Sequence, residues 1–247
     1  MAQLKLYGLV GQNISYSFSA DYFAKKFAKE GLANHSYVNF DLDDINQLPQ
    51  VIENTPGLAG LNITIPYKEK VLPLLHKLSK NATKIGAINT ITFSKKGKLK
   101  GYNTDHYGFK KSLQPLLKPH HEKALILGTG GASKAVAFAL RKLKIEYDFV
   151  SRTATDVVYA YEDLDSTIFN DYQIIINTTP LGTFPNLESC PPIDYSLFTN
   201  NHIAFDLVYN PEETTFLRDA RQFGAVTKNG YDMLVFQAEK AWKIWNR

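Results

Sequence analysis

A glycine-rich string near the middle of the chain is the clearest chemical signal in the sequence. Gly128 to Ser133 reads G-T-G-G-A-S and follows the continuous apolar run Ala124–Leu127, which is typical of a strand buried on both faces. Gly128 would allow a tight turn, Gly130 would let the backbone approach a pyrophosphate, and the next helix would present its N–H groups. Ser133 could cap that helix. The remaining cofactor-binding candidates in this string are Thr129, Gly131 and Ala132. A strand–helix turn without a ligand is the alternative interpretation.

The residues after the next predicted strand bear on the choice of dinucleotide. That strand ends at Val150, and Ser151-Arg152-Thr153 then places a guanidinium between two hydroxyls. These groups suit a 2′-phosphate, so we expect NADP(H) rather than NAD. The nearest acid, Asp148, lies inside the strand and should point away from its tip. A solvated surface arginine is the alternative for Arg152.

Polar residues in the first hundred positions stand where predicted strands pass into helices. Ser17 and Ser19 could bind a carboxylate, although Ser19 is also a sound helix N-cap. Lys68 follows a β-branched run that Pro66 stops. Asp105 could cap the next helix. Each of these features alone is compatible with an ordinary scaffold.

The elements that must position these residues alternate between β-branched runs and amphipathic stretches, which predicts βα units around largely parallel sheets. Lys95 to Lys98 is expected to form a hairpin turn. The predicted strands cover 4–10, 36–40, 124–127, 145–150, 173–176 and 203–207, and the predicted helices cover 20–29, 44–52, 106–117, 133–143 and 231–245.

Composition narrows the class of protein. The 247 residues suffice for one large or two modest domains, and Cys190 is the single cysteine, which excludes a disulfide framework. The net charge of +4 is spread along the chain without a basic stripe, so we expect no nucleic-acid partner. No leader-like start or membrane-length apolar run is present, and we expect a cytoplasmic protein that binds no membrane. The six histidines lack metal-type spacing, so no metal is expected.

Taken in order, the motifs match a known family: the chain resembles the shikimate dehydrogenases along nearly its full length. Members of that family reduce 3-dehydroshikimate to shikimate with NADPH, on the route to chorismate and the aromatic amino acids. The motifs that carry the resemblance are Gly11 to Ser19, Asn62 to Lys68, Gly86 to Thr90, Asn103 to Asp105, Gly128 to Ala132, Ser151 to Thr153, Asn177 to Gly182, Asp206 to Pro211 and Gly230 to Ala238.

The resemblance implies an α/β fold of two domains and a set of roles. A substrate-binding catalytic domain would span 1–103 and be completed by the C-terminal helix 230–247, and a Rossmann-type NADP-binding domain would span 104–229. Lys68 and Asp105 would form the reactive pair. The implied substrate-binding residues are Ser17, Ser19, Thr64, Asn89, Tyr209 and Gln237. Leu207 and Gly230 would join the cofactor-binding residues, and we expect a monomer or a homodimer.

Gln237 has separate support, because it shares a helix face with Met233, Ala241 and Ile244, and an amide among apolar side chains needs a hydrogen-bond partner. A substrate polyol would supply one, and a backbone group is the alternative.

The chain departs from the usual family pattern at several positions. Asp156 stands where many members carry a second arginine, and an acid there would weaken the preference for a 2′-phosphate. Further departures are Tyr16 for histidine, Ala20 for proline, Ser151 for asparagine and Thr183 for methionine. Two alternatives stay open: a quinate/shikimate dehydrogenase that uses NAD, and a catalytically silent NADP-binding module on the same fold.

Overall fold

The computed structural model describes residues 4–15 and 17–247, and the contacts among residues divide the chain into two units. Unit 1 takes the chain up to Thr104 together with Ala238–Arg247, and unit 2 is Asp105–Gln237. The C-terminal helix is therefore shared between the units, whereas the sequence placed all of 230–247 in the first domain. The reason is local: a Cβ on Gly108 would touch Met233 and Gln237, so the start of this helix packs on the helix of Gly108.

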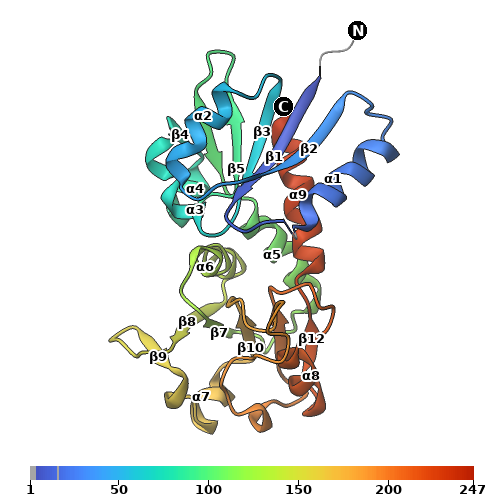
Figure 1. The fold of residues 1–247 in the computed structure, drawn as a ribbon. Helices are drawn as coiled ribbons and strands as arrows, with labels where there is room; N and C mark the ends of the chain where they lie inside the picture. Colours follow the sequence, from blue (N-terminus) through green and yellow to red (C-terminus); the bar gives the residue numbers. More distant parts are fainter. Residues whose placement is uncertain (1–3, 16) are drawn as a thin grey trace. The chain divides into compact units, whose positions relative to one another are not determined.

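Unit 1 is built on a mixed sheet with the strand order β2-β1-β3-β5-β6-β4 (Figure 1). β1, β2 and β3 pair in parallel, β3-β5-β6 is antiparallel, and β4 pairs parallel with β6. The elements are β1 (Lys5–Gly11), α1 (Phe18–Lys29), β2 (His35–Asp41), α2 (Leu48–Glu53), β3 (Leu58–Ile63), α3 (Tyr67–Lys70), β4 (Lys77–Leu78), α4 (Lys80–Ile85), β5 (Thr90–Phe93) and β6 (Leu99–Tyr102), with short 3₁₀ turns at Ile45–Gln47 and Leu72–Leu74.

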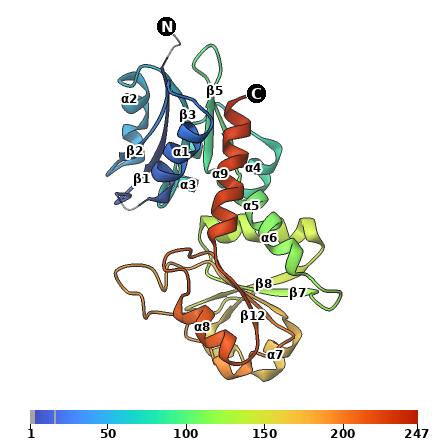
Figure 2. The same cartoon turned by 90° about the vertical axis from the view of Figure 1, so that its right-hand side faces the viewer.

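Apolar side chains cover both faces of this sheet, because successive strand residues point to opposite sides. On one face Val10 packs in a cluster with Tyr67 of α3. On the other face Tyr7 packs with Phe23 of α1 and with Trp245 near the C-terminus. Figure 2 shows the C-terminal helix running along this second face.

Two features of unit 1 differ from, or refine, the sequence prediction. A single helix over 44–52 was expected, but a 3₁₀ turn capped by Asp44 precedes α2, because Pro49 fits only the first turn of the following helix. The turn at Lys95 to Lys98 is confirmed: it joins the antiparallel strands β5 and β6, and Ser94 Oγ accepts hydrogen bonds from the N–H groups of Lys96 and Lys98.

Unit 2 is built on a parallel sheet with the order β12-β11-β10-β7-β8-β9 (Figure 2). From β7 the chain adds β8 and β9 on one side and then returns to add β10, β11 and β12 on the other side, which is the strand order of doubly wound dinucleotide-binding sheets. The elements are α5 (Asp105–Leu113), β7 (Lys123–Leu127), α6 (Gly131–Leu143), β8 (Glu146–Ser151), β9 (Val158–Ala160), α7 (Ser166–Asp171), β10 (Ile174–Asn177), β11 (Ile203–Asp206), α8 (Thr215–Gln222) and β12 (Val226–Lys228), with 3₁₀ turns at Gln114–Leu116, Tyr161–Asp163 and Tyr195–Leu197. The helix shared with unit 1 is α9 (Tyr231–Trp245).

The core of unit 2 is likewise split by the alternation along its strands. Ile126 faces a cluster with Phe109 of α5, whereas Leu125 faces one with Phe216 of α8. The helix predicted over 106–117 is shorter than expected: α5 ends at Leu113 and continues as a 3₁₀ turn, because Pro115 cannot extend the α-helical hydrogen bonds. The predicted α/β class is confirmed, with the first sheet mixed instead of largely parallel. Within the described residues, no helix combines the length and the apolar character needed to cross a bilayer.

His121 is a buried histidine whose two ring nitrogens are both engaged in unit 2. Its Nδ1 accepts a hydrogen bond from the Lys118 N–H (2.8 Å), and its Nε2 lies 3.2 Å from the Asn201 carbonyl, to which it donates in the neutral ring. Burial, with the nearby charge of His120 second, lowers the pKa of His121 below 6.5. A second proton would have to displace the bond at Nδ1.

We therefore expect part of the stability of the fold to be lost at acidic pH through His121. The folded chain binds this proton less readily than the unfolded chain, so the contribution is complete above about pH 6.5 and is lost as the pH falls from there through the folded pKa. The melting temperature of His121→Gln should fall less than that of the unsubstituted chain between about pH 7.5 and about pH 5.5. His120→Gln, at the exposed neighbour, is the comparison variant and should reduce the pH dependence only in part, because it removes the second cause of the lowered pKa of His121 and leaves burial, the first, in place.

Candidate functional site

The glycine turn after β7 has a backbone that only glycine accommodates at its first position. Gly128 has φ +105°, and a Cβ there would lie 2.9 Å from Thr178 Oγ1. The Thr178 hydroxyl in turn donates to the Leu127 carbonyl (2.7 Å), which ties the ends of β7 and β10 together. At Gly130 a Cβ would meet no atom within 4 Å. The turn is thus closely packed on its sheet side at Gly128 and open at Gly130, as a cradle for a pyrophosphate requires.

The helix that starts at this turn offers its first N–H groups to an anion. α6 begins at Gly131, two residues earlier than predicted, and Gly130 occupies its N-cap without a side-chain hydrogen bond. Ser133 does not cap the helix as expected, because its hydroxyl donates to the Gly130 carbonyl (2.6 Å) and is buried. The described residues therefore provide no side-chain cap at this helix end, and backbone N–H groups and the helix dipole remain for a phosphate.

Arg152 lies at the same edge of the sheet as the glycine turn. β7 and β8 are parallel, and their register pairs Leu127 with Val150, so both chains leave the sheet side by side. Ser151 donates to the Thr153 carbonyl (2.6 Å), and this tight turn presents the Arg152 side chain, which is exposed. Such a guanidinium can pair with a 2′-phosphate.

The acids near Arg152 occupy different environments. Asp148 accepts a hydrogen bond from the Tyr172 hydroxyl (2.5 Å) inside unit 2, so this acid is engaged away from the strand tip, as expected from its position within β8. Burial, followed by the bond to Asp148, raises the pKa of Tyr172. Asp156 is exposed and follows Arg152 within the same loop.

A buried carboxylate at the end of β11 shapes the loop that carries Leu207 and Tyr209. Asp206 is fully buried and accepts hydrogen bonds from Asn177 Nδ2 (3.0 Å), the Val208 N–H (2.9 Å) and the Thr214 hydroxyl (2.6 Å). Burial raises its pKa to about 7, and the three hydrogen bonds oppose that rise. Asp206 thus sets the course of the chain after β11.

Gly230 meets the same loop from the other side. Its N–H donates to the Val208 carbonyl (2.9 Å), and a Cβ at Gly230 would collide with the Leu207 carbonyl. Two of the predicted cofactor-binding residues, Leu207 and Gly230, are therefore neighbours in the structure. Asp206 was not among the predicted site residues, although it begins the motif Asp206 to Pro211 and ends β11.

In unit 1 a chain of buried polar groups runs beneath the predicted substrate residues. The Tyr37 hydroxyl donates to Asn62 Oδ1 (2.8 Å), and Asn62 Nδ2 donates to the Asn89 carbonyl (3.0 Å). The Asn89 side chain then accepts from the Thr104 N–H (2.7 Å) and donates to the Thr104 hydroxyl (2.9 Å). Ser19 hydrogen-bonds to Tyr37 at the other end, and burial raises the pKa of Tyr37. We call this chain from Ser19 to Thr104 the polar network.

The segment of Lys68 is fixed to this network through the backbone. The Ile88 N–H donates to the Lys68 carbonyl (2.8 Å), and Asn89 is the next residue. Lys68 is half-buried in the short helix α3, and Thr64 is half-buried just after β3. Unit 1 thus links Ser19 to Asn89 through the polar network, bonds the Lys68 backbone to the residue before Asn89, and holds Thr104, the residue before Asp105, by hydrogen bonds.

The N-cap of α1 is a different serine from the one predicted. Ser17, not Ser19, is the N-cap of α1, and its Oγ accepts the Ser19 N–H (3.3 Å). Ser19 lies in the first turn, and its hydroxyl is used by Tyr37. Tyr16, one of the departures from the family pattern, lies outside the described residues. Tyr37 and Asn62, which join the polar network, were not predicted; the signal was an asparagine inside the buried run 60–63.

In unit 2, Asp105 and Gln237 lie on two helices packed against each other. Asp105 is buried at the start of α5, and a Cβ on Gly108 of this helix would lie 3.1 Å from Gln237 Cβ. Gln237 is half-buried, whereas Met233, on the same face of α9, is buried, so the amide is less enclosed than the sequence suggested.

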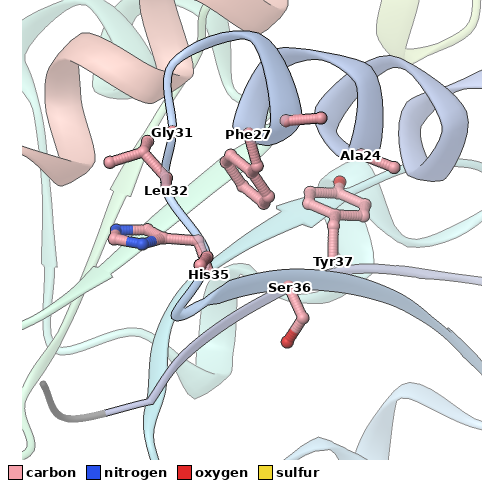
Figure 3. A pocket seen from close by; sticks show the side chains of 9 residues that line it. Ala24, Phe27, Gly31, Leu32, His35, Ser36 and Tyr37 are labelled. Carbon is pink, nitrogen blue, oxygen red and sulfur yellow. The ribbon is translucent and has the colours of Figure 1, made fainter. Parts of the chain in front are cut away.

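Other candidate sites add little. The described residues hold no group of three or more His, Cys, Asp or Glu side chains arranged to bind a metal. A hollow of about 440 Å³ lies between α1 and β2 (Figure 3). Its lining includes Ala24, Phe27, Leu32, His35 and Tyr37, and it contains none of the predicted site residues.

The chain is similar to known proteins along nearly its whole length. A family model described as the shikimate dehydrogenase substrate binding domain matches residues 9–91. The shikimate dehydrogenase (NADP(+)) of Methanosphaera stadtmanae is 34% identical over 257 residues, covering 96% of this chain and 90% of that protein. The chain belongs to the shikimate dehydrogenase family. The resemblance predicted from the ordered motifs is confirmed.

Solved structures of the family agree with this fold. The Thermus thermophilus shikimate 5-dehydrogenase, in complex with NADP(H) and shikimate, superposes with a TM-score of 0.85 at 32% identity, covering 98% of this chain and 93% of that one. A quinate dehydrogenase from Corynebacterium glutamicum, in complex with NAD, gives a TM-score of 0.85 at 28% identity, covering 99% and 94%.

The open position at Gly130 allows a direct test of the cofactor cradle. Gly130→Ala adds a methyl group that meets no protein atom within 4 Å, at φ −78°, so the melting temperature should fall only slightly, through the weaker N-cap preference of alanine. The methyl would occupy the space in which a pyrophosphate approaches the backbone, and we expect the Kd for NADP⁺ to rise about tenfold or more, which is the effect of ~1.4 kcal/mol.

Gly128→Ala is the comparison variant, because φ +105° and the Thr178 contact make it lose stability as well as affinity. Titration of intrinsic fluorescence and thermal melts measure both quantities. An unchanged Kd in Gly130→Ala would mean that the dinucleotide does not use this turn.

Proposed function

We propose that this protein interconverts 3-dehydroshikimate and shikimate with NADP(H). The observation that carries the proposal is the match to shikimate dehydrogenases along 96% of the chain, with Lys68 and Asp105 both present in the matching motifs. The glycine turn, the exposed Arg152 and the uncapped start of α6 fit a phosphorylated dinucleotide. We further propose that the enzyme acts in the cytoplasm, as a monomer or a homodimer.

The cofactor-binding residues would divide the dinucleotide between them. Gly128 to Ala132 and the first N–H groups of α6 would hold the pyrophosphate. Ser151, Arg152 and Thr153 would hold the 2′-phosphate, and Leu207 and Gly230 would lie at the nicotinamide end. When bound, NADPH supplies the hydride for carbonyl reduction.

The substrate-binding residues would orient a ring that carries a carboxylate and several hydroxyls. Ser17 and Ser19 would hold the carboxylate through their hydroxyls. Thr64, Asn89, Tyr209 and Gln237 would hydrogen-bond to the hydroxyl groups, which suits side chains that both donate and accept. The polar network would keep Ser19 and Asn89 in a fixed relation, because each is bonded into the same buried chain.

Lys68 would hold the proton that the reaction needs. Its ammonium group can stabilise negative charge developing on the carbonyl oxygen and then transfer a proton from Nζ to that oxygen. In the oxidative direction the neutral amine would take the proton from the C–OH group. Asp105 would orient Lys68 and accept a hydrogen bond from a substrate hydroxyl. The Ile88 N–H donates to the Lys68 carbonyl and the Thr104 N–H donates to Asn89 Oδ1, so the segments of Lys68 and Thr104 are both bonded to residues 88–89, which supports a common role.

A matrix of initial rates for two acids and two cofactors tests the proposal. Shikimate with NADP⁺ should give the highest kcat/KM of the four combinations with quinate and NAD⁺, measured by the absorbance of the reduced nicotinamide. Faster oxidation of quinate with NAD⁺ would favour the quinate/shikimate alternative. NADP⁺ binding without turnover of either acid would favour the silent module.

Lys68→Ala tests the assignment of the proton donor within that reaction. We expect kcat to fall by about two to four orders of magnitude, as is usual when a general acid is lost, with a smaller change in the KM for shikimate. Lys70→Ala is the matched control, since Lys70 is an exposed lysine on the same short helix. A Lys68→Ala enzyme with nearly normal turnover would exclude this residue as the acid.

A further inference from the structure

Two polar side chains of β2, Asn39 and Asp41, form hydrogen bonds with the loop that carries Ser17. We call residues 11–15 and 17, between β1 and α1, the serine loop. Asp41 accepts hydrogen bonds from two consecutive N–H groups of this loop, those of Asn13 (2.7 Å) and Ile14 (3.1 Å). Asn39 Nδ2 donates to the Ile14 carbonyl (3.2 Å). Asn39 and Asp41 are two residues apart on one strand and therefore share a face, so β2 holds both ends of the Ile14 residue.

Further hydrogen bonds connect Ile14 to Ser17 and Ser17 to Ser19. The Ile14 carbonyl also accepts the Ser17 N–H (3.0 Å), which closes the turn before α1. Ser17 Oγ then accepts the Ser19 N–H as the N-cap of that helix. A shift of the Ile14 backbone would therefore move Ser17 and change the start of α1.

The contact with Asp41 falls at the sharpest backbone feature of the loop. Asn13 has φ +55°, in the left-handed region that asparagine adopts more readily than most non-glycine residues. The N–H of this residue is one of the two that Asp41 binds, and hydrogen bonds to a charged acceptor are stronger than neutral ones. On the other side Gly11 abuts Thr64 and Ile14, since a Cβ there would lie 2.5 and 2.6 Å from their methyl groups. The serine loop is thus fixed between β2 and the end of β3.

We propose that Asp41 is a positioning residue, assisted by Asn39, for the serines that bind the substrate carboxylate. Asp41 would act through the backbone of Asn13 and Ile14, without touching the substrate. This inference rests on the proposed function, because it assumes that Ser17 and Ser19 hold a carboxylate.

The sign of the effect separates this role from simple electrostatics. Asp41 carries a negative charge, and its residue is exposed. If its charge acted only through space, removing it would reduce repulsion and lower the KM for an anionic substrate. If Asp41 positions the serines, the same substitution raises that KM.

The test compares Asp41→Ala, Asp41→Asn and Asn39→Ala in the oxidation of shikimate with NADP⁺. Asp41→Ala should raise the KM for shikimate about tenfold, an effect in the range of lost hydrogen bonds to a charged group. Its kcat should change less than about threefold, and its Kd for NADP⁺ should stay unchanged, because the proposed cofactor cradle lies in unit 2. Asp41→Asn, which keeps one acceptor oxygen, should show an intermediate KM. Asn39→Ala removes no charge and should also raise the KM.

Asp43→Ala is the matched control. Asp43 is an exposed acid two residues further on, and it meets the loop through its carbonyl, which accepts from Gln12 Nε2 (3.4 Å). Its substitution should leave the KM for shikimate unchanged. An Asp41→Ala enzyme with the KM of the Asp43→Ala control, or with a lower one, would overturn the inference.

A double-mutant cycle identifies the route of the effect. In a Ser17→Ala background, Asp41→Ala should add less than half of its effect on the KM, because the hydroxyl that it positions is gone. Full additivity would contradict positioning through Ser17. The proposed function fails separately: it fails if the unsubstituted enzyme does not oxidise shikimate, whereas the inference fails if that enzyme is active and Asp41 proves dispensable.

Discussion

The chain of buried hydrogen bonds from Tyr37 through Asn62 and Asn89 to Thr104 is the constraint on which the substrate side of this protein depends. A neutral hydrogen bond adds only about 1 kcal/mol net, but a buried polar group left without its partner costs about 1–3 kcal/mol. Each amide therefore accepts one arrangement of its neighbours and penalises the others. The network selects a geometry more than it stabilises the fold.

That geometry connects segments far apart in the sequence. Tyr37 lies on β2, Asn62 on β3, Asn89 just before β5 and Thr104 just after β6, so the network runs across the sheet of unit 1. The antiparallel pairing of β3, β5 and β6 brings Asn62, Asn89 and Thr104 to the same end of the sheet, and the Tyr37 hydroxyl reaches Asn62 from within β2. Several residues proposed to bind the substrate lie in short turns next to the strands, such as Thr64 after β3 and Asn89 before β5.

In unit 2 the loops near the predicted cofactor residues are fixed by glycines and by one buried carboxylate. The turn proposed to bind the cofactor and the contact with the loop after β11 both depend on glycine, since a Cβ at Gly128 would crowd Thr178 and a Cβ at Gly230 would collide with the Leu207 carbonyl. Asp206 supplies the polar counterpart, a buried carboxylate with three donors that directs the loop after β11. The turn at Gly128 and the hydrogen-bonded carboxylate of Asp206 together fix the backbone at the carboxyl ends of β7 and β11.

Local sequence signals predicted much of this arrangement. The glycine turn, the β5–β6 hairpin and the terminal helix follow from residue types within a few positions, and the predicted range 231–245 coincides with α9. Helix ends were wrong where proline or capping decided them: Pro115 shortened α5, and Ser17 took the cap assigned to Ser19.

The partners that position the site could not be predicted in the same way. Asp41 reaches residues 27 and 28 positions away, and Tyr37 reaches one 25 positions away. Such contacts depend on strand register, which the periodicity of a single strand does not determine. The prediction therefore found the residues that carry the proposed chemistry by motif and missed those that hold them.

The central claim is that Lys68 and Asp105 act as one catalytic unit, and a double-mutant cycle on kcat tests it most directly. Lys68→Ala, Asp105→Ala and the double variant are compared with the unsubstituted enzyme under saturating shikimate and NADP⁺. If the two groups work together, the kcat of the double variant should lie within about threefold of that of the slower single variant, because the effects of residues that act as a unit are strongly non-additive. If the losses multiply, the two side chains act independently, and the account of a paired acid and carboxylate is contradicted.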